Sequence, residues 1–440
     1  MSLHQQSASG PAPAPEAGFQ SRIKVIRAAV IGTVVEYYDF GIYGYMATFV
    51  AMLFFVSEDP TAALLGTFAA FAVAFFMRVP GGILFGHIGD RYGRKRALSW
   101  TILLMVLATA AIGVLPNYYT LGVWATVLLV LCRCVQGFAA GGELGGANAF
   151  VAESAPARWR ATQTSLVNSG TYFGSLFASL VALTFTTVFT EQQMLDWAWR
   201  LPFLLSLPIG VIGLYIRSHL DDTPQFKQLE DKGETERMPI RTLLVTNWRS
   251  VLKIIGLGAV ITGGYYIVSV YAATYLQTTA GHSAQLAFAS TSVAMVVGAA
   301  TLPLSGYLAD TIGRKKVILI GSVGAALLGF PMFMMMSAGP AWAAIVGQTA
   351  LFVCVSVVNG ASFVTYAEML SASTRYSGIA LGNNVTNTLL GGTAPFVATW
   401  LISATGQPLA PAGYFVLTAL VTLVAVLFVT ETRGTELPID

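Results

Sequence analysis

The chain carries little charge. Asp, Glu, Lys and Arg together make up 10% of its 440 residues, against roughly 25% in an ordinary soluble domain. Apolar residues reach 55%, which is more than a globular protein of this length can hide from water. The composition therefore excludes a soluble enzyme or a nucleic-acid-binding domain and indicates a chain dissolved in the hydrocarbon core of a membrane.

Cysteine and histidine are also scarce. The three cysteines, Cys132, Cys134 and Cys354, all lie in apolar runs, a placement that disfavours a disulfide framework or a metal site. The four histidines are scattered, and no phosphate-binding loop of the G-x-x-x-x-G-K-[ST] type occurs. We therefore expect no metal and no cofactor. An ion gradient must supply the energy for any transport; we favour protons, and sodium stays open.

No cleavable signal is expected at the N-terminus. Residues 1–24 are rich in Ala, Pro, Ser and Gln and predict a disordered cytoplasmic tail. The first apolar run starts near Val25 and is too long for the apolar part of a signal peptide.

Pro, Gly, Asn and charge clusters divide the apolar sequence into segments that can each cross a bilayer. The twelve expected spans lie near 25–56, 61–86, 97–115, 121–151, 161–189, 199–217, 250–277, 284–307, 317–337, 341–367, 376–403 and 411–430. This pattern predicts an all-α membrane protein with twelve transmembrane helices in two pseudo-symmetric six-helix bundles. The expected bundles are 25–217 and 250–430, joined by a cytoplasmic linker at 218–249 and followed by a cytoplasmic tail at 431–440.

The basic residues predict the orientation. Apart from Arg78, Arg133 and Arg200, every Lys and Arg falls in the termini, in the loops or at the span ends on one side of the expected bundle. The loops on the other side contain none. The positive-inside rule therefore predicts that both termini are cytoplasmic.

An internal repeat supports two related halves. The segment from Gly86 to Arg96, GHIGDRYGRKR, returns 220 residues later as GYLADTIGRKK, from Gly306 to Lys316. A fainter repeat pairs Ala-Glu153 with Ala-Glu368, each followed by an arginine. Duplicated six-span halves are a common transporter plan, with the substrate site near the midplane between them.

These residues carry a resemblance to a known family. The pattern G-x-x-x-D-R-x-G-R-K resembles the loop signature of the major facilitator superfamily. Five further segments resemble the metabolite:proton symporter family within it: Glu36-Tyr-Tyr-Asp39-Phe, Met77-Arg78, Arg133-Cys-Val-Gln136-Gly, Gly141-Gly-Glu143 and Trp197-Ala-Trp199-Arg200-Leu-Pro. That family takes up 2-oxoglutarate, citrate, shikimate, aromatic acids, or proline and betaine, so the resemblance leaves the substrate open.

The resemblance also implies a gate on the cytoplasmic side, where the loop acts as a latch for the outward-open state. The expected gating residues are Asp90, Arg94, Asp310, Arg314, Glu153, Glu368 and Arg375. Each copy departs from the family pattern at one position: Ile88 replaces the usual Leu in the first, and Thr311 replaces the usual Arg in the second, which predicts a weaker second latch. The alternative is that the basic residues of the loop only anchor the topology.

Apart from the basic residues at the cytoplasmic ends of the spans, six ionisable residues fall inside the expected spans: Glu36, Asp39, Glu143, Arg78, Arg133 and Arg200. A charge at mid-bilayer costs at least ~2.5–3.5 kcal/mol, so each needs a partner or a function. The equal numbers of acids and bases suggest pairing.

The first span predicts a proton-coupling site. Glu36 and Asp39 share a helix face with Tyr43, about 17–21 Å from the cytoplasmic end of the helix. Arg133 lies at a comparable depth, so a carboxylate that loses Arg133 as its partner would take up a proton. We favour Asp39 as the exchanging group, then Glu36; a static ion pair is the alternative. Glu143 belongs either to this route or to the gate.

Several residues are expected to bind the substrate. The guanidinium groups of Arg78 and Arg200 match a carboxylate, although Arg200 could instead anchor the membrane interface beside Trp197 and Trp199. Polar and aromatic side chains at further positions have little reason to face lipid: Tyr43, Gln136, Asn168, Tyr172, Tyr265, Tyr266, Asn359, Asn384 and Asn387. Tyrosine pairs could also hold a quaternary ammonium; helix packing is the alternative for each of them.

Three embedded arginines favour proton-driven import of a small carboxylate metabolite by alternating access. The second hypothesis is a zwitterionic compatible solute, proline or betaine. It gains support from the tyrosines and loses some because residues 431–440 hold no coiled coil of the kind some osmosensing relatives carry. Drug efflux is disfavoured, because Gly170–Gly174 lacks the proline usual in efflux members.

The expected partners are the substrate, a proton and the lipid bilayer, and no nucleic acid. We expect a monomer in the bacterial cytoplasmic (inner) membrane, and not an enzyme.

Overall fold

The computed structural model describes residues 19–92, 94–141, 144–218 and 247–438. Within these ranges every regular element is a helix and none is a strand. Helices are expected in a bilayer, because each helix satisfies its backbone hydrogen bonds within one segment. The all-α prediction is confirmed.

Each expected span corresponds to one helix or to a short series of helices. In the first half these are α1 (Phe19–Tyr45) with α2 (Ala47–Phe54), α3 (Pro60–Tyr92), α4 (Arg94–Val114), α6 (Val123–Ala140) with α7 (Leu144–Ser154), α8 (Arg160–Val188), and α10 (Arg200–Leu204) with α11 (Ser206–Ser218). Short connecting elements are α5 (Tyr118–Leu121), η1 (Ala157–Trp159), α9 (Glu191–Gln193) and the π-helix η2 (Met194–Ala198).

The second half repeats the plan with more interruptions. Its spans are α14 (Trp248–Ala259) continuing through η3 (Val260–Gly264) and η4 (Ile267–Tyr271) to α15 (Ala272–Thr278), then α16 (Ala284–Ile312), α17 (Arg314–Ala338), α18 (Ala341–Glu368), α19 (Ala372–Thr386) with η5 (Asn387–Gly391) and α20 (Ala394–Thr405), and α21 (Ala410–Leu427). The elements η3, η4 and η5 are π-helices.

Length and apolar composition alone identify fewer spans than twelve. Eight of the described helices are long and apolar enough to cross a membrane, and the bent pair Glu191–Ala198 and Arg200–Tyr215 makes a ninth. The other expected spans are short or broken, as at Met46 between α1 and α2.

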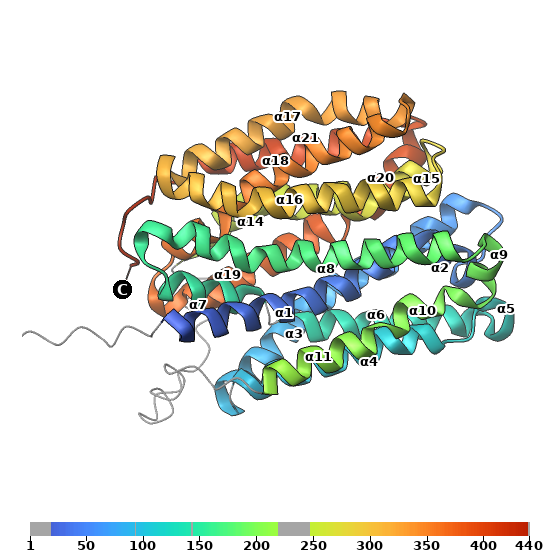
Figure 1. The fold of residues 1–440 in the computed structure, drawn as a ribbon, viewed down its shortest axis with the longest axis horizontal. Coiled ribbons are helices and arrows are strands. Elements are labelled where there is room, and N and C mark those ends of the chain that lie inside the picture. Colours follow the sequence, from blue (N-terminus) through green and yellow to red (C-terminus); the bar gives the residue numbers. More distant parts are fainter. Residues whose placement is uncertain (1–18, 93, 142–143, 219–246, 439–440) are drawn as a thin grey trace, which may run out of the picture.

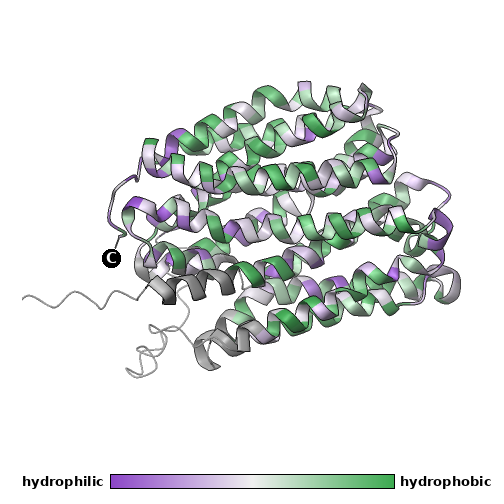
Figure 2. Ribbon diagram, viewed as in Figure 1, coloured by the Kyte–Doolittle hydropathy of each residue, from purple (hydrophilic) through white to green (hydrophobic). Residues whose placement is uncertain are grey.

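The two halves lie side by side. In Figure 1 the first half, blue to green, lies mostly in the lower part of the view, and the second half, yellow to red, lies mostly in the upper part, while α19 lies beside α7 of the first half. Helix α8 of the first half runs along α16 of the second and also packs on α1. Figure 2 shows hydrophobic residues over most of the helix surfaces, with hydrophilic residues gathered toward the two ends of the bundle.

We call the end of the bundle where α1 begins and the C-terminal segment lies the proximal end, and the opposite end the distal end (Figure 1). Helix α1 already begins at Phe19, before the expected start near Val25. Most of the expected linker lies outside the described residues. Residues up to Pro438 of the expected C-terminal tail pack against the proximal end, through Arg160 and Arg375.

Candidate functional site

Glu36 and Arg78 form a buried ion pair. The Arg78 Nη2 atom lies 2.9 Å from Glu36 Oε1, and their side chains are 2% and 0% exposed. The guanidinium group also lies against the rings of Phe40 and Phe75, at 4.4 and 4.7 Å from the ring centres. Helix α1 supplies Glu36 and helix α3 supplies Arg78, so the pair joins the first two spans.

The expected ion pair between a first-span acid and Arg133 is not formed among the described residues in this conformation, and the proton-coupling roles expected for these residues stay predictions. Arg133 donates a 2.7 Å hydrogen bond to Gln136, which in turn donates one of 2.6 Å to Thr109. The Arg133 guanidinium lies 4.1 Å from the ring centre of Tyr43. Asp39 is near enough to Thr109 and Arg133 to interact with both, but no ion pair joins Asp39 to Arg133 in the part of the chain that the structure describes. The acids and Arg133 lie at similar depths along their helices. Which side chains come into contact depends on how each helix is rotated about its own axis.

A narrow cavity lies between the two halves, beside the Glu36–Arg78 pair. Its volume is about 20 Å³. The lining residues come from α1, α8, the seventh span, α18, α19 and η5: Tyr37, Asn168, Thr171, Tyr172, Ile261, Thr262, Tyr265, Tyr266, Asn359, Phe363, Asn383 and Asn387. Six of the expected substrate-binding residues are in this set, namely Asn168, Tyr172, Tyr265, Tyr266, Asn359 and Asn387.

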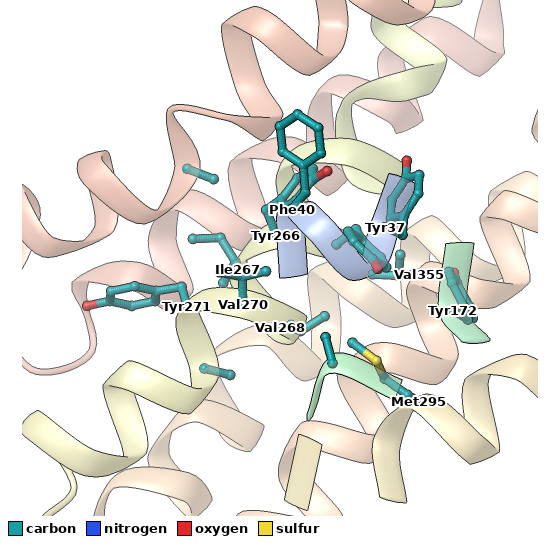
Figure 3. Close-up of a cluster of buried hydrophobic side chains, with 14 of the residues drawn as sticks. Tyr37, Phe40, Tyr172, Tyr266, Ile267, Val268, Val270, Tyr271, Met295 and Val355 are labelled. Carbon is teal, nitrogen blue, oxygen red and sulfur yellow. The ribbon is translucent and has the colours of Figure 1, made fainter. Parts of the chain in front are cut away.

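Four tyrosines gather at the cavity and form what we call the tyrosine box: Tyr37, Tyr172, Tyr265 and Tyr266. The rings of Tyr172 and Tyr265 stack with centres 5.6 Å apart, and those of Tyr265 and Tyr266 meet edge to face at 5.1 Å. Tyr37 meets Tyr265 edge to face at 6.1 Å. Figure 3 shows Tyr37, Tyr172 and Tyr266 on three different helices.

The helix geometry of the seventh span explains how adjacent tyrosines both reach the interior. Tyr265 and Tyr266 stand between the π-helices η3 and η4, and both are almost fully buried. A π-helical turn widens the helix and shifts the direction of the side chains that follow it. In a regular α-helix, adjacent side chains point about 100° apart, so these interruptions help direct both rings inward.

Hydrogen bonds position the rings of the tyrosine box, and some polar atoms around the cavity remain available to a ligand. The hydroxyl groups of Tyr265 and Ser175 are 2.6 Å apart, and Asn359 donates a 3.3 Å hydrogen bond to the Tyr172 hydroxyl. The Asn359 Oδ1 atom and the Asn168 Nδ2 atom have no hydrogen-bond partner among the described residues. A polar ligand could therefore bond to both an acceptor and a donor here.

Four expected substrate-binding residues lie elsewhere. Arg200 donates to the carbonyl oxygens of Gly113 and Leu115, at 3.1 and 2.6 Å, so it fastens α10 to the distal end of α4. Its guanidinium also lies 4.5 Å from the ring centre of Trp199, the arrangement expected of an interfacial anchor, and its role as a substrate ligand stays a prediction. Asn384 donates to the Gly141 carbonyl. Tyr43 and Gln136 contact Arg133 and do not line the cavity.

Charged residues join the halves at the proximal end. Asp310 accepts hydrogen bonds from the backbone N–H groups of Ala161 and Thr162, at 3.1 and 2.9 Å, so its carboxylate caps α8 of the other half. Glu368 pairs with Arg160 at 3.0 Å and with Arg314 at 3.1 Å. We call this set the proximal gate, and Arg160 links it to the first half.

Two more expected gating residues extend the same surface. Arg375 pairs with Glu153 at 2.7 Å and thereby joins the two copies of the fainter repeat. Glu143 and the side chains of Asp90 and Arg94 lie outside the described residues, so their expected roles stay predictions.

Residues that the sequence did not single out also contribute. Glu431 accepts hydrogen bonds from the backbone N–H groups of Arg314 and Lys315 and so caps α17, while Thr432 donates to Glu368. The position of the acidic residue Glu431 directly after the last expected span could have indicated this contact. In the cavity, six lining residues are not among the expected ones: Tyr37, Thr171, Ile261, Thr262, Phe363 and Asn383. Tyr37 could have been identified from its position beside Glu36 in the first helix.

The halves also touch at the distal end. Gln285 of α16 donates a 2.7 Å hydrogen bond to the carbonyl of Thr186 in α8, and Ser179 bonds to Ser292 at 3.0 Å. Contacts between the halves therefore lie on both sides of the cavity. No group of three or more His, Cys, Asp or Glu side chains in the described ranges could hold a metal.

Helices in two halves around a buried polar cavity are the architecture of a secondary transporter. Residues 29–394 match the sequence profile of the Major Facilitator Superfamily, so the chain belongs to that family. It is a multi-pass membrane transporter with the twelve-helix fold of the family, and it is not an enzyme.

Two curated relatives cover almost the same length. The proline/betaine transporter of Escherichia coli K12 is 34% identical over 423 residues, covering 94% of this chain and 84% of the relative. The glycine betaine/proline/ectoine/pipecolic acid transporter of Dickeya dadantii is also 34% identical, with the same coverage.

Solved structures match the fold. The proton:xylose symporter XylE superposes with a TM-score of 0.75 at 17% identity, covering 94% of this chain and 97% of that structure. A D-xylose–proton symporter structure superposes with a TM-score of 0.73 at 20% identity, covering 94% and 99%. At these identities the likeness concerns the fold.

Proposed function

We propose that this chain is a proton-coupled symporter that imports a zwitterionic compatible solute of the proline and betaine class by alternating access. The observation that carries the proposal is the relationship to transporters named for proline and betaine, at 33–34% identity over 94% of the chain. The cavity supports the same choice of substrate on chemical grounds.

A zwitterion needs a place for each of its charges. The tyrosine box offers ring faces to a quaternary or secondary ammonium, and each cation–π contact contributes about 0.5–2 kcal/mol. Arg78 lies next to the box and carries a guanidinium fork that matches a carboxylate. In a betaine or a proline the cation and the carboxylate are separated by one carbon atom, so both sites must be adjacent, as they are here.

The carboxylate-metabolite hypothesis loses part of its basis. It depended on three embedded arginines, but Arg200 lies at the distal end and Arg133 is bonded to Gln136. Only Arg78 remains beside the cavity, which favours a substrate with one carboxylate over a di- or tricarboxylate. The rings of the tyrosine box would then surround a cationic or apolar group of the same substrate.

The basic residues predict the orientation of the protein in the membrane. The positive-inside rule puts the proximal end in the cytoplasm of a bacterial inner membrane. In such a membrane an inside-negative potential favours the entry of a neutral zwitterion together with a proton. We expect the protein to act as a monomer, with the cavity complete in one chain.

A matched pair of solutes tests the substrate. Glycine betaine and 3,3-dimethylbutyrate have the same shape, but the second has a carbon in place of the charged nitrogen. We expect glycine betaine and proline to raise the unfolding temperature of the purified protein, since a ligand that binds the folded state stabilises it. We expect 3,3-dimethylbutyrate, 2-oxoglutarate and citrate to have little effect.

Uptake into proteoliposomes tests the energy source. An inward proton gradient should drive accumulation of labelled betaine, and a protonophore should abolish it. A sodium gradient alone should not replace the proton gradient. Binding of a dicarboxylate without binding of betaine would contradict the proposed substrate.

A further inference from the structure

Two asparagine side chains on the cavity each present a polar atom that the protein itself does not bond. Asn168 of α8 is 1% exposed and Asn359 of α18 is 6% exposed, so both amides are shielded from water. Within residues 19–92, 94–141, 144–218 and 247–438, the donor Asn168 Nδ2 and the acceptor Asn359 Oδ1 have no hydrogen-bond partner. Both residues line the cavity. A buried polar atom without a partner is costly, which favours a ligand that bonds to it.

The second polar atom of each amide is already bonded. Asn359 Nδ2 donates a 3.3 Å hydrogen bond to the Tyr172 hydroxyl, and Asn168 Oδ1 accepts one of 3.1 Å from Asn148 Nδ2. Tyr172 is held in turn by stacking on Tyr265, with ring centres 5.6 Å apart. In this arrangement the second half presents an acceptor to the cavity and the first half presents a donor.

The chemistry of Asn359 Oδ1 differs from that of the hydroxyl groups around it. A hydroxyl group such as that of Tyr172 can donate or accept a hydrogen bond, so it adapts to either kind of ligand group. An amide oxygen can only accept. Asn359 Oδ1 is therefore satisfied only by a ligand that brings an N–H or O–H group to it.

The proposed substrate class contains solutes of two kinds, which differ at the nitrogen. The quaternary ammonium of a betaine has no N–H group, whereas the secondary ammonium of proline has two. Both cations suit the ring faces of the tyrosine box. Only the secondary ammonium gives Asn359 a donor, because methyl groups would cover the amide oxygen and leave it without water and without a partner.

We propose that Asn359 makes the transporter selective for solutes that carry an N–H group on the cation, as proline does, over fully N-methylated betaines. The inference rests on the proposed function and narrows its substrate class. In the complex, one N–H group of the substrate donates to Asn359 Oδ1. The Asn168 amide supplies a donor that suits the carboxylate present in both kinds of solute, so it adds affinity without adding selectivity.

The place of Asn359 in the fold suits recognition during transport. Its hydrogen bond to Tyr172 joins α18 of the second half to α8 of the first. The cavity of about 20 Å³ holds about one water molecule in this conformation, so the helices around it must separate to admit a solute. A solute that bonds to Asn359 therefore binds at the boundary between the halves, where alternating access requires movement.

Three ligands that differ only in N-methylation test the selectivity in wild-type protein. L-proline has two N–H groups, N-methyl-L-proline has one, and N,N-dimethyl-L-proline has none. Isothermal titration of the purified protein gives each affinity. Because one N–H group satisfies Asn359 Oδ1, we expect the first methyl group to change the affinity by less than about threefold and the second to lower it by about tenfold or more.

This series separates hydrogen bonding from size, because each step adds the same methyl group. A loss of similar size at both steps would show that the cavity excludes bulk, and it would overturn the proposal. Equal affinities for the three ligands would overturn it as well. Neither result depends on the folding of a variant.

Matched leucine variants test the assignment to Asn359. Leucine has nearly the shape of asparagine but forms no side-chain hydrogen bond. In Asn359→Leu, the affinities for proline and for N,N-dimethylproline should come within about threefold of each other. In Asn168→Leu, both affinities should fall by a similar factor and the preference for proline should remain. A preference that persists in Asn359→Leu would show that another group selects the substrate.

The outcomes separate this inference from the proposed function. If wild type binds neither glycine betaine nor any of the three proline ligands, the proposed substrate class is wrong. If wild type binds N,N-dimethylproline as tightly as proline, the proposed function stands and the inference fails.

Discussion

Arg78 is the residue on which the substrate site depends most. Its guanidinium pairs with Glu36 and lies between the rings of Phe40 and Phe75. Lysine carries the same charge, but it lacks the planar fork that binds a carboxylate through two hydrogen bonds and stacks on aromatic rings. The shape of the group therefore matters as much as its charge.

Replacing Arg78 by Lys should weaken betaine binding by about tenfold or more, equivalent to about 1.4 kcal/mol. Isothermal titration of the purified protein measures the change. Arg200→Lys is the matched control, because Arg200 binds backbone carbonyls at the distal end, and its betaine affinity should stay at the wild-type value. Equal affinities of Arg78→Lys and wild type would remove Arg78 from the ligand shell.

Tyr265 occupies the centre of the tyrosine box, in contact with the rings of Tyr37, Tyr172 and Tyr266. Tyr265→Phe keeps the ring and loses the hydrogen bond to Ser175, whereas Tyr265→Leu loses the ring as well. If a cation lies in the box, Leu should weaken betaine binding several-fold more than Phe. Titrations of the two variants decide this, and equal losses would mean that the ring face does not hold the cation.

At the scale of elements, the spacing of helices α3 and α6 sets the position of both Arg78 and Arg133. A Cβ atom on Gly137 would lie 1.7 Å from the carbonyl oxygen of Ala74, and one on Gly81 would lie 1.8 Å from that of Phe138. These distances are far below van der Waals contact, so only glycine allows the two backbones to approach this closely.

Gly137→Ala should therefore push α6 away from α3 and destabilise the protein by about 1–3 kcal/mol. Thermal unfolding in detergent should show a lower midpoint, and betaine affinity should fall because Arg78 moves. Gly413→Ala is the control: its Cβ atom would meet only the Phe330 ring, at 3.9 Å. An unchanged midpoint for Gly137→Ala would show that the helix pair can separate without cost.

The backbone between α16 and α17 also requires glycine. Gly313 has φ of 110°, in the left-handed region, and a Cβ atom there would lie 2.5 Å from the Glu431 carboxylate. The same carboxylate caps α17. The loop signature seen in the sequence therefore includes a glycine that allows the C-terminal segment to reach the proximal gate.

At the scale of the whole molecule, Glu368 joins the two halves at the proximal end. It pairs with Arg160 of α8 and with Arg314 of α17, and all three side chains are buried. Removing the charge takes this carboxylate from the buried Arg160 and Arg314, although Arg314 keeps Asp310 at 3.2 Å; breaking a buried pair costs about 3–5 kcal/mol. The closed arrangement of the proximal end would lose most from this change.

Glu368→Gln should therefore shift the protein toward a conformation that is open at the proximal end. Spin labels at the exposed positions Arg158 and Lys316, introduced after replacement of the three native cysteines, should give a longer distance by pulsed electron paramagnetic resonance. Glu191→Gln, an exposed change at the distal end, is the control. The same distance distribution in Glu368→Gln and in the control would show that the gate does not depend on this ion pair.

The sequence alone determined the features that depend on solvent. Long apolar runs with few charges must lie in a bilayer, so the number of spans, their helical structure and the duplicated halves could be predicted from composition and from the repeated loop. The depth of Glu36, Asp39 and Arg133 followed from the rise of a helix, and the cavity position of Asn168, Tyr172 and Tyr266 followed from their polarity in an apolar run.

The tertiary structure decided which groups meet. Arg78 and not Arg133 pairs with Glu36, Arg200 fastens α10 to α4, and the C-terminal segment packs against the proximal gate. The physical reason is that burial depends on the composition of one segment, while an ion pair depends on the rotation and tilt of two helices to within a few ångströms. Those are set by the packing of all the helices together, and no single segment encodes them.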